Sequence, residues 1–244
     1  NRWSIVLDAE ATRFSAALLC DVHLDDIADV SGAATVSEAY DWKEAVVDHG
    51  KHLLATDSTR YRKFIVSGNI RPFQHTWQDT TVRYIKHGYE HPVLDTSHKV
   101  VKAKRRAQIA SAKVIVSGMA KRPTAVWDDE GIAAGKSTVI VIPKVSDDGP
   151  FIAALLNSRF VADLYKVMFG ALSLAGGYMR FGPPQLKALP VPQASSEEKS
   201  ELARLVHMMI NQEDATDRAR ESMDALVEKL YTRPLECTST AKKV

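Results

Sequence analysis

The chain has 244 residues, of which 45% are hydrophobic, and a formal net charge of +2. This length and composition predict a globular protein with one substantial core. Two cysteines, Cys20 and Cys237, are too few for a disulfide framework or a zinc site, and no apolar run approaches the ~20 residues of a membrane span. We therefore expect a cytoplasmic protein with reduced thiols.

The charge is unevenly distributed along the chain. Residues 58–127 carry fourteen Lys and Arg against three acidic residues, and the rest of the chain is net acidic. Such asymmetry is typical of proteins that bind polyanions, most often nucleic acid. A solvated basic surface without a partner would give the same count.

The first hundred residues predict several short elements. Residues 10–20 indicate an amphipathic helix, residues 24–30 a strand or its entrance, and residues 61–66 a strand followed by a turn. Basic residues alternate with aromatic ones between positions 60 and 77. This pattern suits phosphates and flat bases, although any single aromatic side chain is more often part of the core. Residues 99–113 predict a helix with a basic face.

The centre of the chain predicts a stiff apolar frame. Residues 114–116 and 139–142 are dense β-branched runs bounded by turns, and residues 124–127 are a third candidate strand. Two clusters of hydrogen-bond donors, Lys121 with Arg122 and Lys136 with Ser137, lie between these runs. The frame suits the reading of a polar ligand, but it supplies no nucleophile, base or metal ligand.

No catalytic or metal-binding residue is assigned from the sequence. No pair of histidines in the basic half has both the helical i, i+4 spacing and the glutamate partner of a metalloprotease. His87 and His91 are four residues apart, but Gly88 and Pro92 disfavour a helix there. A nuclease site would need the fold to assemble Asp95 with Lys102, or Asp129 and Glu130 with Lys136. We keep this as an alternative.

The last hundred residues predict mainly helices. Pro150 begins a predicted helix that ends at Gly170, and a capping box at Ser195 begins another. Apolar positions between residues 202 and 230 alternate in steps of three and four, as in a coiled coil. This predicts one long helix over residues 195–232, which packs on a partner or covers its own domain, and then a flexible tail over residues 233–244. The fold class is α/β (α+β), with a mixed-sheet domain over residues 1–194.

Five segments in this order carry a family resemblance. They are the Gly32–Tyr40 segment, residues 64–73, the ALLNS sequence that ends at Ser158, the G-x-x-R element that ends at Arg180, and the LPVP exit that ends at Pro192. Together they resemble the TaqI-like C-terminal specificity domain. That domain is the target-recognition half of adenine-specific DNA methyltransferases and type IIG restriction–modification enzymes.

The resemblance implies a non-catalytic module that recognises double-stranded DNA. It would direct an adenine-N6 methyltransferase, with or without a nuclease domain, of the same polypeptide or of a partner subunit. The resemblance suggests that the loops at the strand ends face the bases. The candidates for reading bases are Thr35, Ser37, Glu38, Arg71, Lys121, Arg122, Lys136, Ser137, Tyr178 and Arg180. The candidates for phosphate contacts are Arg62, Lys63, Lys102, Lys104, Arg105, Arg106 and Lys113.

The catalytic motifs of the family's parent enzymes are missing from the sequence. The only Pro-Pro pair, Pro183-Pro184, lacks the flanking residues of a methyltransferase [DNS]-P-P-[YFW] loop, and no Gly-rich cofactor turn is present. We therefore expect S-adenosylmethionine to bind in a catalytic domain upstream of Asn1 and no cofactor to bind this chain. A fragment of a type I specificity subunit is a further alternative, although such subunits repeat the domain and no internal repeat is present.

Overall fold

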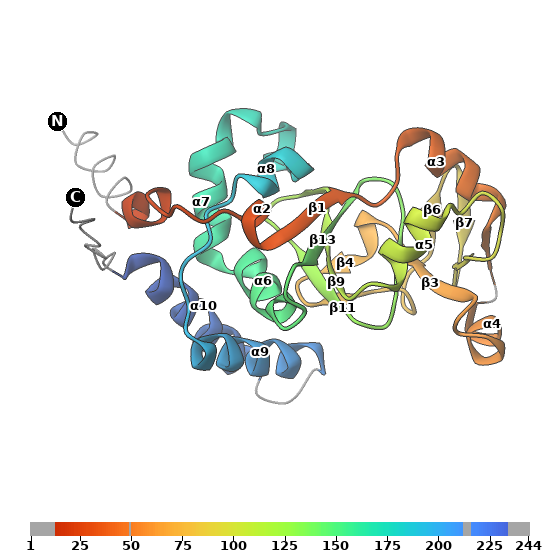
Figure 1. Cartoon of the computed structure of the whole chain (residues 1–244). Helices are drawn as coiled ribbons and strands as arrows, with labels where there is room; N and C mark the ends of the chain where they lie inside the picture. Colours follow the sequence, from red (N-terminus) through yellow and green to blue (C-terminus); the bar gives the residue numbers. More distant parts are fainter. Residues whose placement is uncertain (1–12, 49, 212–215, 234–244) are drawn as a thin grey trace, which may run out of the picture.

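The computed structural model describes residues 13–48, 50–211 and 216–233. A central four-stranded sheet lies between a layer of helices on one face and a second, smaller sheet on the other (Figure 1). The predicted α/β class with a helical C-terminal segment is confirmed.

The central sheet is antiparallel and is buried on both faces. In spatial order it consists of β1 (Ala28–Gly32), β13 (Thr138–Pro143), β9 (Lys113–Ser117) and β11 (Ala125–Asp128). Successive side chains of a strand point to opposite faces. Val114 and Val116 therefore enter the core beneath the helices, while Ile115 enters the core beneath the second sheet. Burial on both faces explains why these runs are apolar throughout, and the three predicted strands are confirmed.

The helix predicted from Pro150 to Gly170 is in fact two helices, α6 (Asp148–Asn157) and α7 (Arg159–Phe169). Ser158 has an extended backbone, and its Oγ accepts a hydrogen bond from the N–H of Val161, which caps α7. The buried Asn157 side chain makes two hydrogen bonds to the backbone of Ala125, with Oδ1 accepting at 3.0 Å and Nδ2 donating at 2.9 Å. These long-range bonds hold the helix end against the edge strand, so the break has a tertiary cause.

The single long helix predicted for residues 195–232 is wrong. The structure has α9 (Ser196–Ile210) and α10 (Thr216–Thr232), and Arg233 beyond the end of α10 pairs with Glu198 near the start of α9. The two helices therefore form an antiparallel hairpin, visible in blue in Figure 1. Their apolar residues, from Leu202 to Leu230, are buried in the same core as α6 and α7. The predicted helix–helix packing through residues 202–230 occurs within the chain. The predicted tail after Arg233 lies outside the described residues.

The second sheet and three short ribbons cover the other face. In spatial order the second sheet contains β12 (Ala133–Ala134), β3 (Tyr61–Ile65), β8 (Val93–Asp95) and β2 (Val46–Val47). The ribbons pair β4 (Ile70–Arg71) with β5 (Gln74–His75), β6 (Val82–Tyr84) with β7 (His87–Tyr89), and β10 (Met119–Ala120) with β14 (Met179–Arg180). The strand predicted at residues 61–66 is confirmed.

Short helices connect these strands, and two predicted segments, the strand at residues 24–30 and the helix at residues 99–113, have different bounds in the structure. After residue 18, the remaining helices are α2 (Leu24–Ile27), α3 (Val36–Asp41), α4 (Gly50–Thr56), α5 (Ala103–Ala110) and α8 (Pro183–Lys187), with 3-10 turns η1 (Trp42–Glu44), η2 (Ser67–Asn69), η3 (Gly170–Leu172) and η4 (Ala175–Gly177). The strand predicted at residues 24–30 begins only at Ala28, after α2. The basic helix α5 is shorter than the predicted span of 99–113, because Lys113 already belongs to β9.

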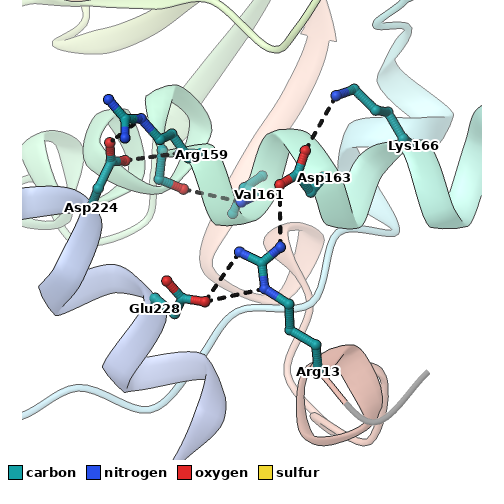
Figure 2. A network of polar contacts seen from close by, with 8 residues as sticks. Arg13, Arg159, Val161, Asp163, Lys166, Asp224 and Glu228 are labelled. Carbon is teal, nitrogen blue, oxygen red and sulfur yellow. Dashed lines mark hydrogen bonds and ion pairs between the residues drawn. The ribbon is translucent and has the colours of Figure 1, made fainter. Parts of the chain in front are cut away.

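A polar network joins the first described helix, residues 13–18, to α7 and α10 (Figure 2). Arg13 bridges Asp163 on α7 at 3.3 Å and Glu228 on α10 at 3.1 Å. A second bridge links Arg159 to Asp224 at 3.2 Å. The two bridges of Arg13 join exposed side chains, whereas Asp224 is largely buried. Exposed pairs are each worth about 0–1 kcal/mol, so Arg13 orients the helices more than it stabilises them.

Candidate nucleic-acid interface

Several loops converge at one end of the central sheet, which we call the loop edge. It contains Gly32 at the end of β1, Ser117 at the end of β9 and Thr138 at the start of β13. The N–H of Gly118 donates to the carbonyl of Ser137 at 2.9 Å, and the N–H of Phe181 donates to the carbonyl of Gly118 at 3.0 Å. The loops after β9, before β13 and around β14 are therefore tied directly to one another.

Close packing fixes these loops. A Cβ atom at Gly118 would lie 2.4 Å from the Ser137 carbonyl oxygen, so only glycine allows this approach. Ser137 has a φ of 70°, a conformation uncommon outside glycine. The Ser67 side chain donates to the same Ser137 carbonyl, which brings η2 to the loop edge as well. The backbone of the loop edge is therefore held in one conformation, and this conformation fixes the positions of the side chains that the loops carry.

The β10–β14 ribbon has one buried and one exposed face. Met119 lies opposite Arg180 and Ala120 opposite Met179, so Lys121 falls opposite Tyr178. Met179 is 3% exposed and belongs to the main core. The other face, which we call the ribbon face, carries four exposed side chains: Met119, Lys121, Tyr178 and Arg180. The Lys121 ammonium lies 5.9 Å from the centre of the Tyr178 ring.

The cations of the loop edge have few internal partners. Within the part of the chain that the structure describes, Lys121, Arg122, Lys136 and Arg180 form no ion pair. Among the described residues, Arg71 donates only to backbone carbonyls, those of Gly68 and Ile70 at 3.0 Å. These positive charges therefore face solvent without neutralisation by a described carboxylate. Arg122 does not pair with Asp128 across the turn, because Asp128 lies at the opposite end of the sheet, paired with Lys113.

Thr35 and Glu38 have a structural role at the start of α3. Thr35 Oγ1 accepts from the N–H of Glu38 at 3.2 Å, and Glu38 Oε2 accepts from the N–H of Thr35 at 2.8 Å. Glu38 also pairs with Arg105 at 2.7 Å, and hydrogen bonding by that guanidinium lowers the pKa of Glu38 to about 2. The polar groups of both residues are thus engaged within the protein. Ser37 is exposed on α3 and remains a candidate for reading bases.

Two predicted phosphate contacts are contradicted by burial. Lys113 is 1% exposed, and its ammonium pairs with Asp128 and donates to the carbonyl of Ile109 at 2.7 Å. Burial lowers the pKa of Lys113, and the Asp128 carboxylate opposes this effect. Arg105 is 9% exposed and binds Glu38 and the carbonyl of Gly32. Neither charged group is free to reach a phosphate.

The other phosphate candidates fall into two places. Lys102, Lys104 and Arg106 are exposed on or next to α5, and α5 is held against the loop edge by its hydrogen bonds to β1. Arg62 and Lys63 instead bind the backbone and the carboxylate of Glu130, at the far end of the sheet. The first group lies beside the base-reading candidates and the second does not.

The alternative nuclease constellations are not assembled. Asp129 and Glu130 follow β11 at the end opposite Lys136, and Asp95 is paired with Arg60 at 2.6 Å. Among the described residues, no group of three or more His, Cys, Asp or Glu side chains is placed to hold a metal ion. Over the same residues, no helix is both long enough and apolar enough to cross a membrane.

Met119 and Leu172 were missed as members of this surface. Met119 is 46% exposed and shares the ribbon face with the cations, and Leu172, at 55%, ends the η3 turn that packs against β14. An apolar side chain in the sequence is read as core by default. Only the pairing of β10 with β14 reveals that positions 119, 121, 178 and 180 share one face.

No protein-family model and no curated protein matches the chain. Among solved structures, the chain is similar to the type IIL restriction–modification enzyme MmeI, whose structure is of a complex with DNA. The two are 9% identical with a TM-score of 0.47, and the match covers 86% of this chain and 33% of that one. This chain therefore spans about a third of the length of that enzyme. The ligand of this chain is therefore inferred from its own residues.

Proposed function

We propose that this chain is a sequence-specific DNA recognition module of a restriction–modification system and is not catalytic by itself. The observation that supports this best is the ribbon face, where Lys121, Tyr178 and Arg180 stand exposed on one side of a two-stranded ribbon. The order of motifs that resembles the TaqI-like specificity domain points to the same function.

The chemistry of the surface suits duplex DNA. A two-stranded ribbon fits the major groove, where Arg and Lys donate to guanine O6 and N7. The exposed cations of the α5 region, Lys102, Lys104 and Arg106, would contact phosphates and set the register, while the ribbon face and Lys136 read base edges. A catalytic carboxylate or bound metal is not required for this role.

The proposal assigns the chemistry to a separate methyltransferase, in the same polypeptide or in a partner subunit. That domain would bind S-adenosylmethionine and modify adenine N6, and this chain would bring it to its site. If the parent protein also cleaves DNA, the proposal assigns that activity to a further domain and not to this chain.

The test is selection of binding sequences from random duplexes without Mg²⁺, followed by titrations on selected and scrambled duplexes at two salt concentrations. We expect Lys121→Ala and Arg180→Ala to lose about 1–3 kcal/mol on the selected duplex and little on the scrambled one. Lys229→Ala, which removes an exposed cation on α10, is the matched control and should bind as the wild type does. Equal losses on both duplexes would remove these residues from sequence reading. Cleavage of the duplex after addition of Mg²⁺ would favour the nuclease alternative.

A further inference from the structure

Three large apolar side chains are exposed next to the two ribbon cations. Met119 is 46% exposed, Leu172 55% and Tyr178 43%. They belong together because β14 pairs with β10 and packs against η3, and because the N–H of Leu174 donates to the carbonyl of Tyr178 at 2.7 Å. We call these three residues the wedge patch.

The segment that carries most of the wedge patch is free of charge. Residues 170–178 read GALSLAGGY, and most of them are exposed. Soluble proteins rarely leave contiguous apolar surface open unless a partner covers it. The segment also contains two consecutive glycines with positive φ, 74° at Gly176 and 75° at Gly177, and a side chain at Gly177 would meet nothing within 4 Å. A partner can therefore approach the backbone closely here.

The surroundings of the wedge patch restrict the chemistry of that partner. Lys121 and Arg180 flank the patch, and no described carboxylate pairs with either of them. The partner must present flat apolar surface and negative charge within the span of one short ribbon. An opened base step framed by phosphates has this combination, whereas an apolar protein surface would leave both cations without partners.

We propose that Met119, Leu172 and Tyr178 enter the duplex and unstack a base step, with Lys121 and Arg180 donating to the base edges on either side. This inference rests on the proposed DNA-binding function. Methionine and leucine are among the side chains that minor-groove proteins insert between base steps to kink DNA, by about 20–90°. Here the ribbon would insert them from the major groove. Pyrimidine–purine steps unstack most easily, so the selected binding site should contain a TA or CA/TG step where the patch inserts.

The experiment places 2-aminopurine at each adenine of the selected duplex in turn and measures its fluorescence with and without the full chain. End-to-end energy transfer on the same duplex reports the bend. We expect fluorescence to rise severalfold at one step, together with a shortening of the end-to-end distance. Leu172→Ala and Met119→Ala should each reduce both signals while the affinity for scrambled duplex stays unchanged.

Val145→Ala is the matched control, because Val145 is equally apolar, 60% exposed, and follows β13 at the opposite end of the sheet from the loop edge. It should leave both signals unchanged. Tight binding without unstacking or bending would overturn the wedge and leave the proposed function intact. Absence of any DNA binding would overturn both. A dimer of the free chain that Leu172→Ala dissociates would assign the patch to a second copy and likewise overturn the inference.

Discussion

Replacing Lys113 with Met separates a role in the core from a role on DNA. The Lys113 ammonium donates to the carbonyl of Ile109 at 2.7 Å and pairs with Asp128, whose side chain is fully buried. Methionine preserves much of the aliphatic volume but removes the charge. The Asp128 carboxylate would keep only the backbone N–H groups of Glu130, Gly131 and Ile132, at 3.0, 3.0 and 2.8 Å.

These contacts set the size of the effect. Removing one partner of a buried ion pair costs about 3–5 kcal/mol, because the remaining charge is left uncompensated. Three backbone donors still face the carboxylate, so we expect the lower end of this range, about 3 kcal/mol. Domains of this kind have free energies of unfolding of about 5–15 kcal/mol, so the variant should fold but be clearly weakened.

Urea unfolding and DNA titration over a range of salt concentrations form the assay. Lys113→Met should lower the urea midpoint and leave the salt slope of DNA binding unchanged. Lys104→Met, an exposed change on α5, is the matched control. It should alter stability by less than about 0.5 kcal/mol and, if Lys104 contacts a phosphate, reduce the salt slope by about 0.9. An unchanged urea midpoint with a reduced slope for Lys113→Met would refute the assignment of this lysine to the core.

Three further predictions concern stability and cofactor binding. The pKa of Glu38 is lowered in the folded state from 4.5 to about 2, so its stabilising effect is complete above pH 4.5 and is lost as pH falls through 2. The gap in unfolding free energy between Glu38→Gln and wild type should close over that window, and a constant gap would contradict this. A Cβ at Gly149 would lie 1.9 Å from the Trp127 ring, so Gly149→Ala should destabilise the protein by about 1–3 kcal/mol in urea, whereas Gly170→Ala, with nothing within 4 Å, should not. Calorimetric titration of the isolated chain with S-adenosylmethionine should give no binding heat; micromolar one-to-one binding would contradict the separation of recognition from chemistry.

The central strands could be predicted because their signal is local. Dense β-branched runs between turns have few other stable arrangements, and burial on both faces explains their composition. The helix break at Ser158 depends instead on bonds from Asn157 to Ala125, a residue distant in sequence. The apolar spacing of residues 202–230 is equally compatible with one helix or two, because the periodicity continues on both sides of the break.

In the candidate site, too, the sequence predicted what depends on local composition and missed what depends on contacts between distant residues. Local counting identified the basic half of the chain, but it could not tell which cations pair with a carboxylate elsewhere. Arg105 finds Glu38 across 67 positions, and Lys113 finds Asp128 on the neighbouring strand. Met119 was missed because its exposure depends on pairing with a strand that follows α7.

That pairing has a consequence for newly made protein. β10 precedes and β14 follows the two helices α6 and α7, so the ribbon cannot form until both helices have been synthesised. Closing such a long loop is among the slower events of folding. A nascent or partly opened chain would present the cations of α5 without the ribbon. We expect it to bind DNA weakly and without discrimination, so that loss of sequence preference precedes loss of affinity as the protein is warmed towards unfolding.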